Sequence, residues 1–248
     1  AVLDTGVLYD HPDLGRGDLA GKLLPGFDFV SVTRSTNDGD SRDSDPSDPG
    51  DWVNDADKAG DAGFANCTVQ GSSWHGTRVS GMIGALSNNS TGITGMSWNS
   101  FVLPVRVLGK CGGVDSDILA GMRWAAGLHV NGIPDNPTPA RILNLSLGST
   151  SACEASYRDV INELTARKVL VVISAGFSET GQEGKARQAE LVNVCRGAGM
   201  RLIGPNCMGI ANTNPTVLLD ATFAPAAPPP GRVGFSSQSG ALGLAIMV

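Results

Sequence analysis

The alternation of short apolar strands with amphipathic helices constrains the fold most. Strand-like runs lie at 1–3, 101–108, 141–147, 169–173, 200–203 and 232–235. Between them, apolar residues recur at the spacing of a helix with one face on a sheet, at 118–126, 157–164 and 191–198. Elements that alternate in this way form a parallel sheet covered by helices on both faces. The sequence therefore predicts an α/β fold, with three α/β/α layers and a mostly parallel sheet.

Length and charge exclude some classes of partner. The 248 residues, 41% of them apolar, suffice for one large domain or two small ones. The formal net charge is −6 and only 17% of residues are charged, which argues against binding nucleic acid or an anionic membrane. The longest apolar run, 169–173, is too short to span a bilayer. We expect neither a nucleic-acid partner nor a membrane.

Two stretches differ in composition from the rest. Residues 33–63 are crowded with Asp, Asn, Ser and Gly and are predicted to be loop throughout. Residues 212–231 are rich in proline and are predicted to be an irregular connection.

The five cysteines lie at 67, 111, 153, 195 and 207. None forms a C-x-x-C pair or alternates with histidine at zinc spacing. By count alone, one or two disulfides in a secreted protein and five buried thiols in a cytosolic one are equally compatible with the sequence.

Polar residues occur where strands end and where a helix begins. Asp4, in D-T-G-V, closes the first strand, and His75, in H-G-T-R-V-S-G, opens a glycine-rich helix. Two further strands end in S-L-G at 146–148 and in S-A-G at 174–176. The carboxyl edge of a parallel sheet is where active sites of open α/β folds gather. Taken alone, D-T-G is more often a turn, and a histidine at a helix start is commonly a cap.

In their order, these segments resemble the subtilisin-type serine proteases (subtilases) of the secreted bacterial kind. H-P-D-L at 11–14, N-N-S-T-G-I-T-G at 88–95 and L-P-V-R-V-L-G at 103–109 add to the resemblance, which covers residues 1 to about 172. It implies that Asp4 orients the imidazole and that His75 acts as general base. It also implies a secreted protein with a disulfide between Cys67 and Cys111. We expect no bond among Cys153 and the two later cysteines.

The same resemblance implies where a peptide substrate would bind. Gly112 and Gly113 resemble one edge strand of the cleft, and Ser146, Leu147 and Gly148 resemble the other. An extended peptide would pair with both by β-augmentation.

Calcium is the expected cofactor, at two places. Asp13 and Asn89, with carbonyls near 86, 91 and 93, resemble the loop site of the family. Asp43, Asp45, Asp48 and Asp51 supply a run of closely spaced carboxylates, the hard oxygen ligands that calcium prefers. The alternative for this second run is a solvated acidic loop.

The resemblance to proteases stops before the nucleophile. The 248 residues contain no G-T-S-M-A segment, and Phe177 stands where the family places the asparagine of the oxyanion hole. Residues 172–181, 201–209 and 231–243 instead resemble the NDP-forming acyl-CoA synthetases, the group of the succinyl-CoA synthetase α-subunit. In that family S-x-S-G opens a helix toward a phosphate, so Gln238, Ser239 and Gly240 are the candidate anion site.

We therefore interpret the chain as a chimera, natural or engineered, joined near 170–176. Residues 1–172 form a subtilase-like segment, and residues 173–248 a synthetase-like segment that we predict to share the same sheet. The predicted function is a serine endopeptidase by descent, inactive or very weak as it stands, with Ser239 as a candidate surrogate nucleophile. The alternative is a non-catalytic recombined α/β scaffold, and acyl-CoA synthetase activity is the least favoured.

Overall fold

The computed structural model describes residues 1–17, 21–148 and 155–173, with short pieces at 186, 189–190, 192–193, 209–212 and 219–222. The chain divides into two compact units, Ala1–Val172 and Ile173–Val248. Among the described residues, no helix is long and apolar enough to cross a membrane.

A five-stranded sheet organises the first part of the chain. Its strands are β1 (Val2–Asp4), β2 (Phe27–Asp28), β3 (Pro104–Arg106), β4 (Ile142–Leu145) and β5 (Leu170–Ile173), in the order β2-β3-β1-β4-β5. The pairs β2–β3, β3–β1 and β1–β4 are parallel. The register aligns Val2 with both Pro104 and Asn144. The predicted α/β fold with a mostly parallel sheet is confirmed.

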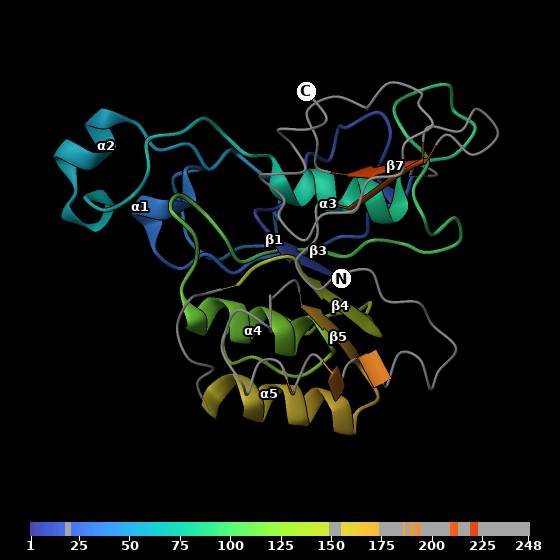
Figure 1. The fold of residues 1–248 in the computed structure, drawn as a ribbon. Coiled ribbons are helices and arrows are strands. Elements are labelled where there is room, and N and C mark those ends of the chain that lie inside the picture. The colour runs from blue at the N-terminus through green and yellow to red at the C-terminus, as the bar shows by residue number, and fades with distance from the viewer. Residues whose placement is uncertain are drawn as a thin grey trace. The chain divides into compact units, whose positions relative to one another are not determined.

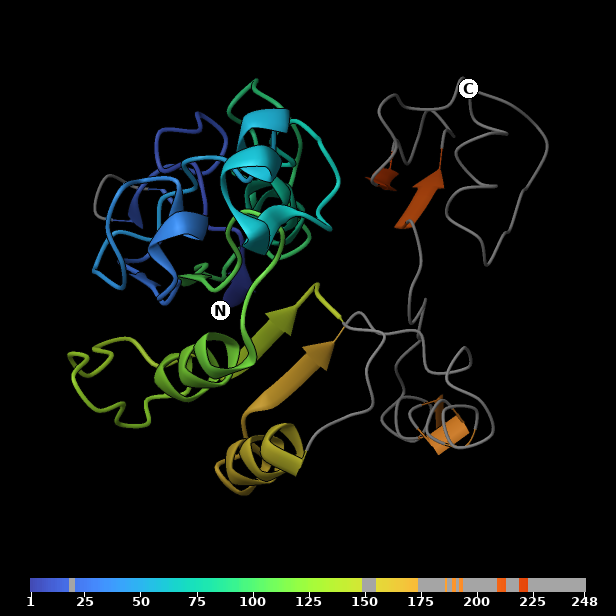
Figure 2. The same cartoon turned by 90° about the vertical axis from the view of Figure 1, so that its left-hand side faces the viewer.

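Helices cover both faces of this sheet (Figure 1). Helix α3 (His75–Gly84) lies on one face, and α4 (Asp115–Ala125) and α5 (Ala155–Ala166) lie side by side on the other, as Figure 2 also shows in green and gold. The predicted apolar stripes are buried where α4 and α5 pack: Ile118, Met122 and Ala125 on α4, and Val160 and Leu164 on α5.

A glycine lets α4 approach the sheet closely. A Cβ at Gly121 would lie 2.8 Å from a methyl of Val107, just beyond β3. On the opposite face, α3 contributes Val79 to a buried cluster with Val2, Val7, Leu14, Leu23 and Val102. These contacts fix α3, and with it His75, against the central strand.

The acidic stretch 33–63 is not loop throughout, so that prediction is wrong. It contains α1 (Thr33–Thr36), α2 (Asp55–Gly60) and the 3₁₀ helix η2 (Ala62–Phe64). A capping box starts α2: the Asn54 side chain accepts from the Asp57 N–H at 2.8 Å, and the Asp57 carboxylate accepts from the Asn54 N–H at 2.9 Å. Asp and Asn, which prediction treats as loop formers, here cap short helices.

In the second unit, β6 (Gly209–Asn212) and β7 (Leu219–Thr222) form an antiparallel pair. Strand β7 falls inside the stretch predicted to be irregular, so this prediction is wrong in part. The strands predicted at 200–203 and 232–235 lie outside the described residues. That one sheet runs through both segments stays a prediction.

Candidate active site

Asp4 and His75 meet at the carboxyl edge of the sheet. Asp4 ends β1 and is fully buried, whereas His75 is the first residue of α3 and its side chain is 34% exposed. The imidazole Nδ1 lies 2.8 Å from Oδ1 and 2.9 Å from Oδ2 of Asp4. A carboxylate only accepts, so it selects the tautomer in which Nδ1 carries the proton. The contact expected between the two side chains is present.

The surroundings favour a charged imidazole. The hydrogen bond that His75 donates to Asp4 raises the pKa of His75 most, and the negative charges of Asp4 and Asp51 raise it further. Partial burial and the charge of Arg78 act in the opposite direction, but the net pKa is above its ordinary value. The Thr5 N–H donates to Oδ1 of Asp4 at 2.8 Å, which holds the carboxylate in place. Asp4 can thus stabilise a positive charge that develops on His75.

The glycine that follows His75 is required by a close contact between α3 and the central strand. A Cβ on Gly76 would lie 2.1 Å from the carbonyl oxygen of Gly6, at the end of the central strand. Only glycine allows α3 to begin this close to β1. Trp74, directly before His75, has a left-handed backbone with φ of 51°.

Two hydroxyl residues next to this pair, Thr5 and Ser73, were not predicted to support it, and their carboxylate partners Asp48 and Asp51 were predicted as calcium ligands instead. Thr5 and Ser73 flank the pair through their hydroxyls, which donate to Asp48 at 2.7 Å and to Asp51 at 2.8 Å. The spacing of Asp48 and Asp51 offers no signal, because both belong to a stretch dense in aspartate. Thr5 lies within the D-T-G motif, which is the one signal that could have drawn attention to it.

The predicted disulfide is confirmed, and it lies beside the predicted substrate edge. Cys67 and Cys111 are bonded, with Cα atoms 5.8 Å apart. Gly112 and Gly113 are exposed, and the N–H and C=O of Gly112 are bonded to Gly109 in a tight turn. That these glycines pair with a peptide stays a prediction.

The other predicted edge follows β4. Ser146, Leu147 and Gly148 come directly after its last residue, with Gly148 exposed. The Ser146 hydroxyl accepts from the Asn144 side chain at 2.9 Å. Since Val2 aligns with Asn144, Asp4 and Ser146 end their strands at the same edge.

The structure brings together the two predicted loop ligands. Asp13 is buried, and its oxygens accept from the side chain of Asn89 at 2.7 Å and from the N–H of Ile93 at 2.8 Å. In the structure the amide nitrogen of Asn89 faces Asp13, and the amide oxygen accepts from the N–H of Thr91 at 3.2 Å, so a cation here would require the amide to turn. That calcium binds at this loop stays a prediction.

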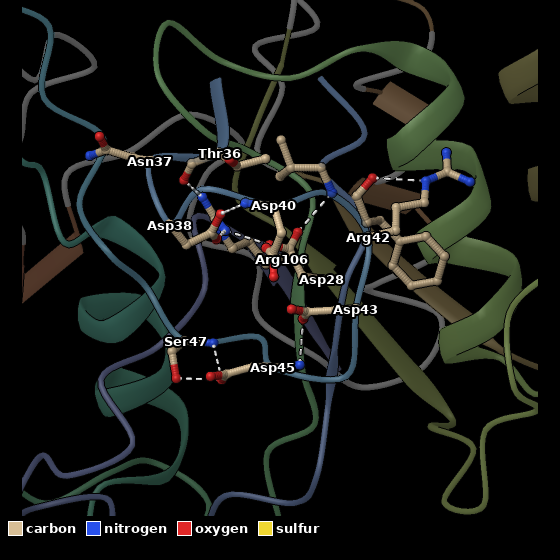
Figure 3. A network of polar contacts seen from close by, with 12 residues as sticks. Asp28, Thr36, Asn37, Asp38, Asp40, Arg42, Asp43, Asp45, Ser47 and Arg106 are labelled. Carbon is tan, nitrogen blue, oxygen red and sulfur yellow. Dashed lines mark hydrogen bonds and ion pairs between the residues drawn. The ribbon is translucent and has the colours of Figure 1, made fainter. Parts of the chain in front are cut away.

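The candidate calcium ligands of the acidic insert, residues 33–63, bond to other groups of the protein, and Figure 3 shows Asp43 and Asp45 doing so. Asp43 accepts from the N–H of Asp45, and Asp45 accepts from the N–H and hydroxyl of Ser47. Asp48 accepts instead from Thr5 and from the Gly50 N–H. Among the described residues, no group of three or more His, Cys, Asp or Glu could hold a metal.

A buried arginine neutralises part of the insert instead. Arg106, on β3, is only 1% exposed and is paired with Asp28 and Asp38, as Figure 3 shows. Its guanidinium also donates to the carbonyl of Thr36. Burial raises the pKa of Asp28 to about 7, even though Arg106 acts to lower it. This arginine follows three apolar residues in the sequence, and no motif predicted its partners.

The remaining predicted site residues lie outside the described residues. They are Gln238, Ser239 and Gly240, and Phe177 at the oxyanion position lies outside as well.

An α/β sheet that places a buried carboxylate against a helix-start histidine defines a subtilisin-like arrangement. Residues 1–216 match the model of the subtilase family, so the chain belongs to that family. It is 45% identical over 176 residues to the extracellular basic protease of Dichelobacter nodosus, covering 71% of this chain and 28% of that protein. A solved protease structure from Pseudoalteromonas arctica superposes with a TM-score of 0.61 at 44% identity, covering 69% of this chain and 47% of that one.

A second likeness concerns a shorter segment. The chain is 54% identical over 80 residues to the α-subunit of an ADP-forming acetate–CoA ligase of Pyrococcus furiosus, 32% of this chain and 17% of that protein. Both resemblances expected from the sequence are therefore present. The two matches overlap, because together they exceed the length of the chain.

Proposed function

We propose that this chain carries the acid–base half of a serine endopeptidase, with His75 as the general base and Asp4 as the residue that orients it. The observation that supports this most is the contact of His75 Nδ1 with both Asp4 oxygens, at 2.8 and 2.9 Å. In a triad, the carboxylate fixes the tautomer and stabilises the imidazolium while the other ring nitrogen takes the proton of the nucleophile. The substrate would be an extended peptide along Gly112–Gly113 and Ser146–Gly148.

We further propose that these 248 residues by themselves hydrolyse peptides only at the background rate. In subtilisin, a member of the same family, removal of the serine is known to lower kcat by about 2 × 10⁶. Loss of its oxyanion asparagine is known to cost roughly 10²–10³ there. Here no G-T-S-M-A segment is present, and Phe177 has no side-chain donor. Ser239 is the candidate surrogate, since the sequence predicts that it opens an apolar helix, as the family's nucleophile does.

A fluorophosphonate probe tests this proposal, because only an activated serine reacts with it. We expect no labelling of the purified chain, and equal peptide hydrolysis by the chain and by His75→Ala. Labelling or turnover that disappears in His75→Ala would overturn the proposed inactivity. Loss of that activity in Ser239→Ala would then identify the nucleophile.

The likeness to the ligase favours a second candidate, a recombined α/β scaffold without catalytic activity. Its one expected ligand is an anion at Gln238, Ser239 and Gly240, where helix N–H groups would face a phosphate. Titration with inorganic phosphate, followed by NMR, tests it against Ser239→Ala. The absence of phosphate-dependent shifts at these three residues in the parent would exclude the anion site.

We also propose calcium as a ligand of the Asp13 loop and secretion as the fate of the chain. The first is supported by the Asp13 carboxylate and by the Asn89 amide in contact with it, whose oxygen would turn toward the ion. The disulfide and the extracellular protease that the chain resembles support the second, because disulfides persist in oxidising compartments.

A further inference from the structure

We propose that Asp48 and Asp51, two buried carboxylates of the acidic insert, are positioning residues for His75. Each carboxylate orients one hydroxyl, and each hydroxyl accepts one N–H from the start of α3. The N–H of His75 and the N–H of Gly76, the first two residues of the helix, are the donors. The insert thereby holds the backbone that carries the base. The inference rests on the proposed role of His75 and adds the residues through which the protein would set its geometry.

The first of these connections runs from Asp48 through Thr5. The Thr5 hydroxyl donates to Asp48 at 2.7 Å and accepts from the N–H of Gly76 at 3.0 Å. Asp48 and Thr5 are each 4% exposed, so water does not compete freely for these groups. A hydroxyl has one proton, and Asp48 fixes its direction, which leaves a lone pair aimed at Gly76.

The second connection runs from Asp51 through Ser73. Asp51, which is 8% exposed, accepts from the Ser73 N–H at 2.6 Å and from its hydroxyl at 2.8 Å. The Ser73 hydroxyl in turn accepts from the N–H of His75 at 3.3 Å. The pattern is the same as for Asp48: carboxylate, hydroxyl, then an N–H of the helix start.

The N–H groups at a helix start have no partner within the helix. Here residue 74 is tryptophan, which offers no side-chain cap to α3. The two hydroxyls therefore satisfy the N–H groups of residues 75 and 76, of which a usual cap would serve the N–H of residue 76. Because the donors flank the imidazole on its own backbone, a shift in either connection would rotate His75 away from Asp4.

The charges around His75 add a second effect. The charged groups that face the imidazole are Asp4 and Asp51, which raise its pKa, and Arg78, which lowers it. Asp51 thus acts through its charge as well as through Ser73. Asp48 acts through Thr5, so its substitution is the cleaner test of position.

The experiment follows the His75 imidazole by NMR in the full chain. The protein has three histidines, and His75→Ala assigns the signal. Two quantities are measured: the water exchange of the Nδ1 proton that faces Asp4, and the pKa of the ring. Thr5→Val removes the hydroxyl at nearly equal volume, and Thr5→Ser keeps it. Asp48→Ala removes the carboxylate, and Asp55→Asn, an exposed carboxylate at the start of α2, is the matched control.

We expect exchange at least about tenfold faster in Thr5→Val and in Asp48→Ala, because a buried hydrogen bond no longer restrains the helix start. Thr5→Ser and Asp55→Asn should match the parent. Asp51→Asn should also lower the pKa of His75. If Asp48→Ala does not fold, the pair Thr5→Val and Thr5→Ser decides the question.

Exchange in Thr5→Val equal to that in Thr5→Ser would overturn the proposal. This outcome is independent of the proposed activity, since the NMR signal reports the position of the ring and not turnover. Conversely, activity without His75 would refute its role as base and leave the measured restraint intact.

Discussion

Removing the disulfide should cost the first unit much of its stability. The bond joins Cys67 to Cys111, a sequence separation of 44 residues, and the loop it closes contains α3 and β3. The entropy of closing a loop of this length in the unfolded chain corresponds to about 4 kcal/mol at 25 °C. For a unit of this size, each kcal/mol moves the melting temperature by roughly 2–4 °C, so the expected loss is about 8–16 °C.

The perturbation is the double variant Cys67→Ser with Cys111→Ser, and guanidinium unfolding followed by tryptophan fluorescence is the assay. All four tryptophans lie between residues 52 and 124, so the signal reports the unit Ala1–Val172. Reductant should destabilise the parent and leave the double variant unchanged, and Cys153→Ser should behave as the parent. A double variant within about 1 kcal/mol of the oxidised parent would refute the loop-entropy reasoning.

Three further predictions concern α3, its histidine and the calcium loop. Gly76→Ala should lower the free energy of unfolding by about 2 kcal/mol or more, because its Cβ would overlap a carbonyl. Gly81→Ala, whose Cβ would meet nothing within 4 Å, should raise it by about 0.5–1 kcal/mol. Chemical denaturation measures both changes. The pKa of His75 is raised above 6.5, so its contribution to stability is complete below that pH and is lost as pH rises through the folded pKa. The free energy of unfolding of the parent should therefore exceed that of Asp4→Asn by an amount that shrinks as the pH rises. A difference between the two proteins that stays constant with pH would contradict this prediction. Calcium should raise the melting temperature of the parent but not of Asp13→Ala, and an equal rise in both would exclude this site.

The sheet could be predicted from local patterns, and the Asp4–His75 pair from the order of motifs that resembles the subtilases. Apolar runs between amphipathic helices specify parallel strands, whose carboxyl ends share one edge. D-T-G ends one such strand and H-G-T opens a helix, but that their two side chains meet is what the resemblance to the subtilases implies. The buried stripe of α4, which includes Ile118 and Met122, follows from helical period.

The acidic insert could not be predicted because its interactions have no period. Whether an aspartate caps a turn, pairs with a buried arginine or reaches a hydroxyl depends on residues that lie far away in the sequence. Asp45 bonds two residues along the chain, whereas Asp48 bonds Thr5 across 43 positions, and both occur in the same run. Arg106 was missed for the same reason, since only the fold brings Asp28 and Asp38 around it.

The supports of the base are complete within the first third of the chain. Asp4, Thr5, Asp48, Asp51 and His75 all precede residue 77, and the contacts that join them need no residue beyond it. The geometry of the acid–base pair is therefore set independently of any nucleophile. A serine segment placed at this edge would meet an imidazole whose tautomer and helix are already fixed, so the proposed inactivity places the barrier in the nucleophile and the oxyanion donors. A variant that carries both groups, with the acidic insert left unchanged, should therefore hydrolyse peptides.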